Sequence, residues 1–237
     1  MSAVPSNDNE LRERRLIEGV IARTSLFRGV HGAPLSALAR QCWSLSARRG
    51  ERFLERGARL PGVFAVAYGS VKLALGQPGH DERVLRLVQA GQTFGEPSAL
   101  LGRPARYDAQ ALADCKLVII PTVAIYALVD DEPRAARKII HGLAERSFEV
   151  LAELESTSLR RGTERLAAYL LSLAGPEAPQ PCTVRLPATK TVIASRLDMK
   201  KETFSRLLRA LAEQGLISVA QRNITILDRE RLGSTAG

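Results

Sequence analysis

The segment from Thr189 to Ile217, TKTVIASRLDMKKETFSRLLRALAEQGLI, decides the fold of the C-terminal part of the chain. Thr189 is suited to cap a helix that runs to Leu197, and Asp198-Met199 predicts a tight turn. A second helix is predicted over 200–214, with Gly215 as the residue that ends it. Two short helices joined by a turn, the second basic at its start, form a helix-turn-helix.

The residues around this segment extend the motif. Leu216–Ala220 and Ile224–Leu227 are apolar runs separated by Gln221-Arg222-Asn223, which predicts a two-stranded wing. Upstream, Thr183–Leu186 has the composition of a short strand. Before it, Gly162 is a candidate hinge, and Thr163 is expected to cap a helix over 164–173.

Helical spacing gives the second helix of the motif two different faces. Its apolar face comprises Phe204, Leu207, Leu208 and Leu211, and its polar face comprises Glu202, Ser205, Arg206 and Arg209. Arg can bond guanine O6 and N7, Glu can accept from cytosine N4, and each good contact gives roughly 1–3 kcal/mol of discrimination. We therefore expect the polar face to read DNA bases; the alternative is a solvated face with i,i+4 ion pairs.

A second set of residues is expected to contact the phosphate backbone of the DNA. Phosphate contacts position a protein on the duplex without specifying its sequence. The residues expected to make them are Thr189, Lys190, Lys200, Lys201 and Arg222.

A long helix is predicted before this region, because no proline occurs between Pro133 and Pro176. Apolar residues in it alternate at spacings of four and three, a pattern typical of a coiled-coil seam. The seam residues are Ala136, Ile140, Leu143, Ser147, Val150, Leu154 and Thr157. The pattern indicates a dimerisation helix over 133–160; the alternative is an amphipathic helix that packs on its own domain.

The N-terminal half has the pattern of a β-rich domain, because glycines separate short apolar runs from Arg49 to Pro121. Val71, Leu73 and Leu75 alternate with Lys72 and Ala74, which predicts a half-buried strand, and Gln77-Pro78-Gly79 predicts a hairpin turn. Strands are predicted at Arg52–Leu54, Phe64–Ala67, Ser70–Leu75, Glu82–Val88, Tyr107–Leu112 and Lys116–Pro121. Many short strands favour a small jelly roll. Before them we expect a flexible arm to about residue 15 and short helices from about 16 to 47.

Composition limits the function classes. The net charge is +9, and from Arg160 onward 13 Lys+Arg stand against 7 Asp+Glu, which suits a nucleic-acid partner. Cys42, Cys115 and Cys182 are too far apart for a zinc or iron–sulfur site, so we expect reduced thiols. No apolar run is long enough for a transmembrane helix and no signal peptide is recognised, so a cytoplasmic protein without membrane contact is expected.

Three motifs together resemble the CRP/FNR family of transcription regulators: Glu202-Thr203-Phe204-Ser205-Arg206, Gly69-Ser70-Val71-Lys72-Leu73 and Gly91-Gln92-Thr93-Phe94-Gly95-Glu96. The resemblance implies an α+β chain with an N-terminal β jelly-roll sensor domain of the cyclic-nucleotide-binding type, a long dimerisation helix and a C-terminal winged helix-turn-helix. The expected boundaries are 1–24 for the arm and first helix, 25–132 for the sensor, 133–160 for the dimerisation helix and 161–237 for the DNA-binding domain.

The resemblance also implies a mode of action. The chain is expected to act as a homodimer on double-stranded DNA with FNR-like inverted repeats, and to activate transcription through RNA polymerase. Among the family's branches, residues 202–208 and Ile226–Leu232 resemble the DNR branch, which responds to nitric oxide through haem. Haem is therefore a hypothesis, with His31 and His141 as candidate ligands; His80 is expected on a hairpin tip.

The resemblance places the sensor pocket at Gly95, Glu96, Arg106, Tyr107, Val150 and Leu151. Tyr107 replaces the family's small hydroxyl residue and is bulky, although Arg106 could bond a phosphate. Val150 and Leu151 stand where the family offers hydroxyl groups to adenine. Cyclic AMP is therefore not expected to bind, and without an N-terminal cysteine cluster no iron–sulfur cluster is expected.

Other classes fit less well. No Ser/His/Asp or Cys/His set has supporting spacing, and Gly91–Gly95 lacks the strand–loop–helix context of a phosphate loop, so an enzyme is not expected. Two alternatives stay open. The chain could be an effector-independent or small-molecule-responsive regulator, or an interaction module of the cyclic-nucleotide-binding fold.

Overall fold

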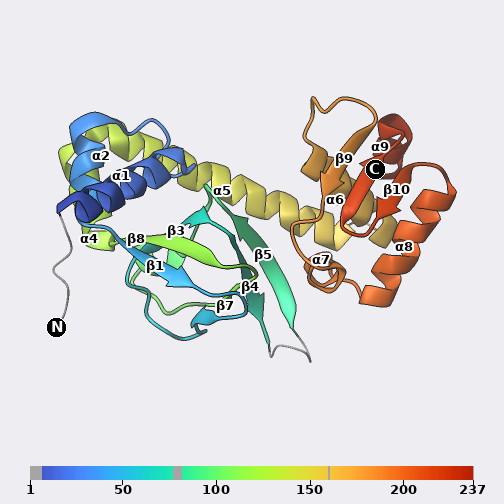
Figure 1. Cartoon of the computed structure of the whole chain (residues 1–237), viewed down its shortest axis with the longest axis horizontal. Coiled ribbons are helices and arrows are strands. Elements are labelled where there is room, and N and C mark those ends of the chain that lie inside the picture. Colours follow the sequence, from blue (N-terminus) through green and yellow to red (C-terminus); the bar gives the residue numbers. More distant parts are fainter. Residues whose placement is uncertain (1–6, 77–81, 160, 237) are drawn as a thin grey trace. The chain divides into compact units, whose positions relative to one another are not determined.

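The computed structural model describes residues 7–76, 82–159 and 161–236, and the chain divides into two compact units (Figure 1). The first unit comprises Met1–Leu75 and Leu85–Ser147, and the second comprises Gly76–Val84 and Phe148–Gly237. The helix α5, Pro133–Leu159, contributes residues to both units. The turn predicted at 77–79 and the hairpin-tip His80 lie outside the described residues.

Two four-stranded sheets build the β-rich part, with strand orders β1-β8-β3-β6 and β2-β7-β4-β5. The strands are β1 (Trp43–Ala47), β2 (Arg52–Leu54), β3 (Val63–Tyr68), β4 (Ser70–Leu75), β5 (Arg83–Gln89), β6 (Thr93–Phe94), β7 (Asp108–Ala111) and β8 (Cys115–Ile120). Apolar residues from both sheets share one core, in which the rings of Phe64 and Phe94 stack at 4.9 Å and Leu73 and Val88 are buried. This sandwich confirms the predicted jelly-roll class.

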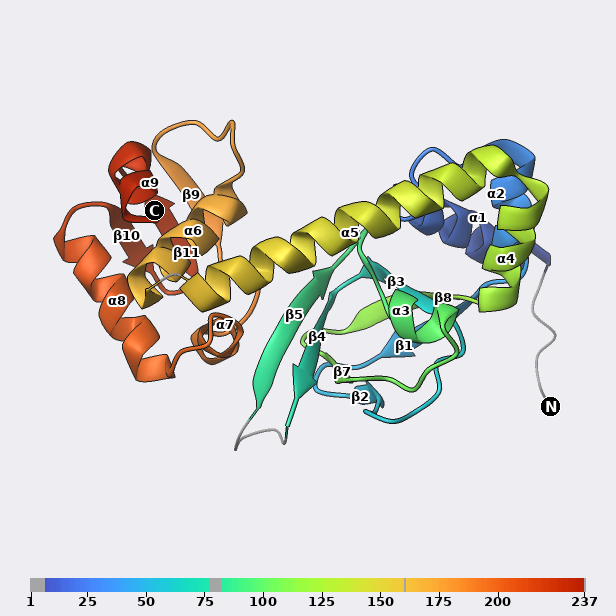
Figure 2. The ribbon, with the colours of Figure 1, turned by 180° about the vertical axis from the view of Figure 1, so that it is seen from behind.

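Helices cover one side of the sheet that contains β3 and β8. They are α1 (Asn7–Arg23), α2 (Gly32–Ala39), α4 (Thr122–Asp131) and the first part of α5, and Figure 2 shows them together. Their buried residues form a second core with Val118 and Ile120 of β8, including Ile21, Leu38 and Ile125. A short helix, α3 (Glu96–Leu100), follows β6.

Three expectations for the first unit were wrong. The helix α1 begins at Asn7 rather than near residue 16, and within the stretch expected to be a flexible arm its Glu13 accepts a hydrogen bond from Ser44 and pairs with Lys116. Residues 43–47 form the strand β1 rather than a helix, because they pair with β8. Both faces of β4 are covered, and Lys72 is only 6% exposed, so this strand is not half-buried.

The second unit contains the predicted winged helix-turn-helix, and its three strands form one sheet of order β10-β11-β9. Its elements are α6 (Gly162–Ala174), β9 (Cys182–Arg185), α7 (Lys190–Arg196), α8 (Lys201–Glu213), β10 (Ile217–Ala220), β11 (Asn223–Ile226) and α9 (Arg229–Ala236). The helix α6 begins at Gly162 rather than after a Thr163 cap, because the carboxylate of Glu164 accepts a hydrogen bond from the Arg161 amide. The helix α9 was not predicted. None of the described helices has the length and hydropathy to cross a membrane.

Candidate nucleic-acid interface

The turn between α7 and α8 sets the direction of α8. Thr189 caps α7, because its hydroxyl accepts a hydrogen bond from the Val192 amide at 3.4 Å, as predicted. At the other end Asp198 has a φ of +52°, a left-handed conformation that non-glycine residues adopt at a cost. The guanidinium of Arg165 on α6 donates hydrogen bonds to the carbonyl oxygens of Leu197 (2.9 Å) and Asp198 (3.3 Å). These bonds hold the turn in place.

A second contact holds α7 to residues 82–84, which belong to the same unit. The hydroxyl of Ser195 donates to the carbonyl oxygen of Glu82 at 2.8 Å and accepts from the amide of Val84 at 3.0 Å. Next to it, the guanidinium of Arg83 lies 3.8 Å from the carboxylate of Asp198. Sequence reasoning missed Arg165 and Ser195, because the partners of both residues are distant in the chain.

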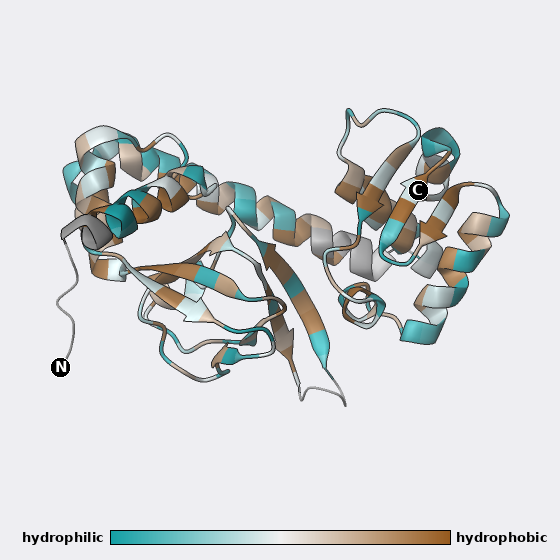
Figure 3. Ribbon diagram, viewed as in Figure 1, coloured by the Kyte–Doolittle hydropathy of each residue, from teal (hydrophilic) through white to brown (hydrophobic). Residues whose placement is uncertain are grey.

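The two faces of α8 differ as predicted. Phe204, Leu208 and Leu211 are buried, whereas Leu207, which was also expected on the apolar face, is only half-buried. The four expected base-reading residues, Glu202, Ser205, Arg206 and Arg209, are all exposed. Figure 3 shows the resulting mixture of hydrophilic and hydrophobic residues along this helix.

The exposed face of α8 is not occupied by ion pairs within the helix. Glu202 and Arg206 are four residues apart, a spacing at which such pairs form. In the described residues, however, neither of them has an ion-pair partner, and neither does Arg209. Their hydrogen-bonding groups are therefore available to an external partner.

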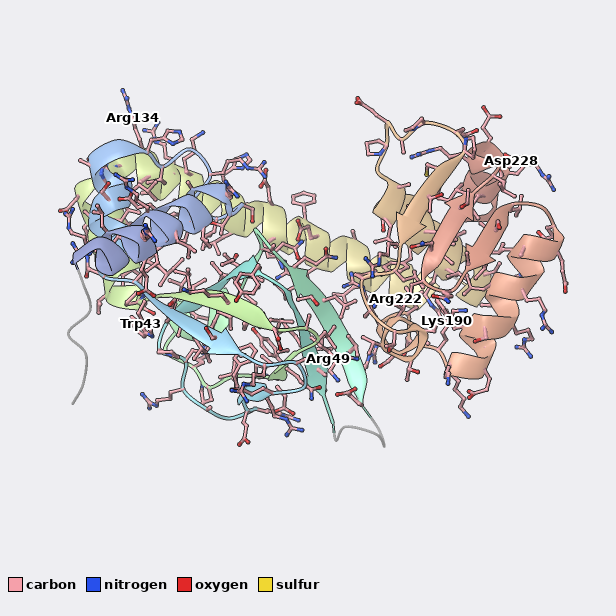
Figure 4. All side chains as sticks on the ribbon, viewed as in Figure 1. Trp43, Arg49, Arg134, Lys190, Arg222 and Asp228 are labelled. Atoms are coloured by element: carbon pink, nitrogen blue, oxygen red, sulfur yellow. The ribbon has the colours of Figure 1, made fainter. Side chains whose placement is uncertain are left out.

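The expected phosphate-binding residues have two kinds of surroundings. Thr189, Lys200 and Lys201 are exposed, and Lys190 is half-buried. The half-buried Arg222 (Figure 4) donates two hydrogen bonds, of 3.1 and 2.7 Å, to the carbonyl oxygen of Leu186. Arg222 therefore also holds the wing against the segment that precedes α7.

Part of the expected sensor pocket comes together in the first unit. Gly95 has a φ of +91° and precedes a buried Glu96. Burial raises the pKa of Tyr107 to about 12, and the charge of Glu96 adds to this rise. Arg86, a hydrogen bond from the Gly95 backbone and Arg146 oppose it. Tyr107 therefore stays a neutral phenol near pH 7, among groups of both charges.

The other expected pocket residues are not enclosed. Arg106 is exposed, and so are Val150 and Leu151, which belong to the second unit. Sequence reasoning missed Arg86 and Arg146, which carry no motif; Arg86 also donates a hydrogen bond to the carbonyl oxygen of Thr93 at 2.8 Å.

The candidate haem ligands do not form an enclosed site. His31 is exposed at the start of α2. His141 is exposed on α5, and its Nδ1 lies 3.3 Å from the Glu145 carboxylate. Among the residues that the structure describes, no group of three His, Cys, Asp or Glu could hold a metal ion. Cys42, Cys115 and Cys182 are free thiols.

The expected dimer seam is only partly exposed. Leu143 is half-buried and packs against the core of its own unit, together with the buried Ala135 and Ile139. It therefore does not face outward as the seam predicts. Four other seam residues are exposed: Ile140 (65% exposed), Ser147, Val150 and Leu154. Ala136 is half-buried, and the side chain of Thr157 lies outside the described residues. Phe148 and Leu151 (61% exposed) add to the exposed apolar surface.

The two units thus define a class of protein: a DNA-binding regulator with a cyclic-nucleotide-binding-type domain and a winged helix-turn-helix. Family models match both parts, the cyclic nucleotide-binding domain at residues 44–132 and the Crp-like helix-turn-helix domain at residues 164–235. The chain belongs to the CRP/FNR family of transcription regulators, which are not enzymes.

Individual relatives agree with this assignment. The chain is 24% identical to a CRP-like cAMP-activated global transcriptional regulator of Mycobacterium tuberculosis, over 93% of this chain and 100% of the relative. It is similar to a solved CRP/FNR regulator of Thermus thermophilus, with 25% identity, TM-score 0.63 and coverage of 82% and 98% of the two chains. FixK2 of Bradyrhizobium japonicum has the same fold, with TM-score 0.72, 22% identity and coverage of 83% and 98%. These matches do not single out the DNR branch.

Replacing Arg165 with alanine is expected to loosen the turn before α8. The change removes the bonds to the carbonyl oxygens of Leu197 and Asp198, and bonds to charged groups contribute about 1.5–3 kcal/mol. Hydrogen exchange at the amides of Asp198 and Met199, which donate to the carbonyl oxygens of Ser195 and Ala194, should become at least about tenfold faster, since 1.4 kcal/mol is a factor of ten. Arg185→Ala, on the exposed side of β9, is the control, and unchanged exchange in Arg165→Ala would contradict this role.

Proposed function

We propose that the chain acts as a dimer that reads an FNR-type inverted repeat, with one α8 helix in each of two successive major grooves. One observation carries the proposal: α8 buries its apolar face and exposes Glu202, Ser205, Arg206 and Arg209, whose charged members have no ion-pair partner among the described residues. A carboxylate, a hydroxyl and guanidinium groups in the first turns of such a helix match the donors and acceptors of base edges.

The exposed residues of α5 support the dimer. Ile140, Phe148, Leu151 and Leu154 are large apolar side chains on one helix, and each is more than half exposed. A second copy of α5 would bury them in a two-fold interface. Such a dimer presents two α8 helices to two half-sites, which explains why the operator should be an inverted repeat.

The proposed control lies in the first unit, where a signal shifts an equilibrium between conformations of the dimer. Tyr107 is half-buried beside Gly95 and Glu96, where the family resemblance places the ligand phosphate, and Arg106 is exposed. We therefore propose a regulator that does not respond to cyclic AMP. Activation through RNA polymerase is part of the same proposal.

Nitric oxide sensing through haem gains no support from the placement of the histidines, because His31 and His141 are both exposed. It rests on the resemblance of the α8 segment to the DNR branch. An absorption spectrum of protein expressed with haem supply tests it: a Soret band would support the hypothesis, and its absence would remove it.

Arg206→Ala is expected to lower the affinity for the inverted repeat by about 10- to 100-fold, since one bidentate base contact is worth roughly 1–3 kcal/mol. Affinity for unrelated duplex DNA should change little. Lys201→Ala is the contrasting variant, because a lost phosphate contact weakens both kinds of DNA alike and lowers the salt slope by about 1. Fluorescence anisotropy over a salt series measures both. Equal losses on specific and unrelated DNA for Arg206→Ala would contradict base reading and make Arg206 a phosphate contact.

Leu151→Glu is expected to dissociate the dimer without unfolding the chain, because this side chain is 61% exposed in the single subunit. Leu143→Glu should instead lower the stability of the first unit, since Leu143 packs against the core of its own subunit. Light scattering gives the mass of each variant, and urea unfolding followed by circular dichroism gives its stability. A dimeric, fully folded Leu151→Glu variant would refute the proposed interface.

Calorimetric titration of the wild-type protein with cyclic AMP is expected to show no binding, because Tyr107 fills space beside Gly95 and Glu96. Tyr107→Ser, which introduces a small hydroxyl residue, should bind more tightly than the wild type if the phenol alone blocks the site. Tyr107→Phe retains the ring and serves as the control. A wild-type dissociation constant in the micromolar range would overturn this part of the proposal.

A further inference from the structure

Seven exposed arginines surround the outer strand of the β2-β7-β4-β5 sheet, far along the chain from the helix-turn-helix. We call this surface the arginine edge; it consists of Arg48, Arg49, Arg52, Arg56, Arg59, Arg103 and Arg106. Figure 4 marks Arg49 on it. The loop with Arg103 and Arg106 lies against the loop that follows β2, because the backbone of Ala105 exchanges hydrogen bonds with Gly57 (2.9 Å) and Ala58 (2.8 Å). The arginines therefore share one surface.

Three acidic residues of this surface accept hydrogen bonds from backbone amides, whereas Glu55 is exposed to solvent. A carboxylate oxygen of Glu51 accepts from the amide of Arg48 at 2.9 Å, and one of Asp114 accepts from the amide of Arg49 at 2.8 Å. Asp108 accepts from the amide of Arg56 at 2.8 Å. These carboxylates stabilise the turns around β2. Of the three, only Asp108 also forms an ion pair with an arginine of this edge among the described residues.

Only one arginine of this edge has an ion-pair partner within the described ranges. The guanidinium of Arg52 lies 3.9 Å from the second carboxylate oxygen of Asp108. The other six have no ion-pair partner among the described residues. Guanidinium groups of this kind bind phosphate oxygens in a bidentate manner.

The distribution of charge between the two units also indicates that the chain has a basic surface outside the helix-turn-helix. The first unit has 20 Lys+Arg against 13 Asp+Glu, a net charge of +7. The second unit has 14 against 12, a net charge of +2, because the acidic residues of α5 after Phe148 offset the basic DNA-binding region. Most of the positive charge therefore lies in the unit that does not contain α8.

We propose that the arginine edge binds the phosphate backbone of DNA outside the operator. An acidic protein is the less favoured partner, because protein interfaces have an apolar core. Residues 48–60 include no exposed large hydrophobic side chain, and the loop with Arg103 and Arg106 has one next to it, Leu101. Interfaces with DNA are more polar and more positive. The inference rests on the proposed function, since a protein bound at its operator holds the adjacent DNA at a high local concentration.

The test compares two duplexes: the inverted repeat alone, and the same repeat extended by about three helical turns, roughly 30 base pairs, on each side. The wild-type protein is expected to bind the extended duplex at least about fivefold more tightly, with a steeper salt dependence, because each phosphate contact adds about 0.9 to the slope. Arg48→Glu, Arg56→Glu and Arg59→Glu combined should lose this gain and keep the affinity for the short duplex. Arg52 in β2 is unchanged and the glutamates keep the residues around this strand charged, so aggregation through the strand is not expected.

The matched control combines Arg28→Glu, Arg40→Glu and Arg134→Glu, which make the same charge change at exposed positions of the first unit outside the arginine edge. This control should retain the gain from the extended duplex. An edge variant that retains the gain as well would overturn the proposal. An edge variant that retains the gain from the extended duplex but no longer activates transcription with purified polymerase would also overturn the proposal. That result would indicate an acidic protein partner.

A third duplex, long and without the repeat, separates this inference from the proposed function. If the wild-type protein did not prefer the repeat, the proposed function would fail. The arginine edge would still be tested, because the edge variant should bind the long unrelated duplex more weakly than the control variant does. Equal affinities of the two variants there would overturn it.

Discussion

The polar face of α8 depends on the turn that precedes it. Asp198 adopts a left-handed backbone conformation, and Arg165 donates hydrogen bonds to the carbonyl oxygens of Leu197 and Asp198. With this turn in place, Phe204 is buried in the second unit and Arg206, two residues later, is exposed. A different turn would change the direction in which α8 leaves α7, although its apolar residues would still favour burial. The position of the proposed base-reading surface therefore depends on one backbone conformation and on the guanidinium that stabilises it.

Features that depend on local sequence could be predicted, and those that depend on distant partners could not. The faces of α8 follow from a spacing within 13 residues, and the cap at Thr189 from a single side chain. In contrast, the alternation in β4 did not reveal that the face with Lys72 is covered as well. The seam spacing on α5 includes Leu143, but which apolar residues of a helix face its own core is decided by the helices packed on it.

The candidate sensor site also combines residues that the sequence could identify with residues that it could not. Gly95, Glu96 and Tyr107 were found from a motif, and the structure places them together. Arg86 and Arg146, which act on the same phenol, come from β5 and α5 and have no sequence signature. Their charges can be associated with the site only once the strand and the helix are placed around it. Family membership defines the architecture and the DNA-binding class, whereas it does not identify the neighbours of Tyr107.

The contact of Ser195 has a consequence for how this family member can change over evolution. Its hydroxyl binds backbone atoms of Glu82 and Val84, so the identity of those side chains matters little to the two bonds. Their spacing matters, because the bonded carbonyl and amide must both reach one oxygen atom. Insertions or deletions at these positions should therefore be selected against more strongly than point substitutions, and the length of this segment should vary less among orthologues than its composition.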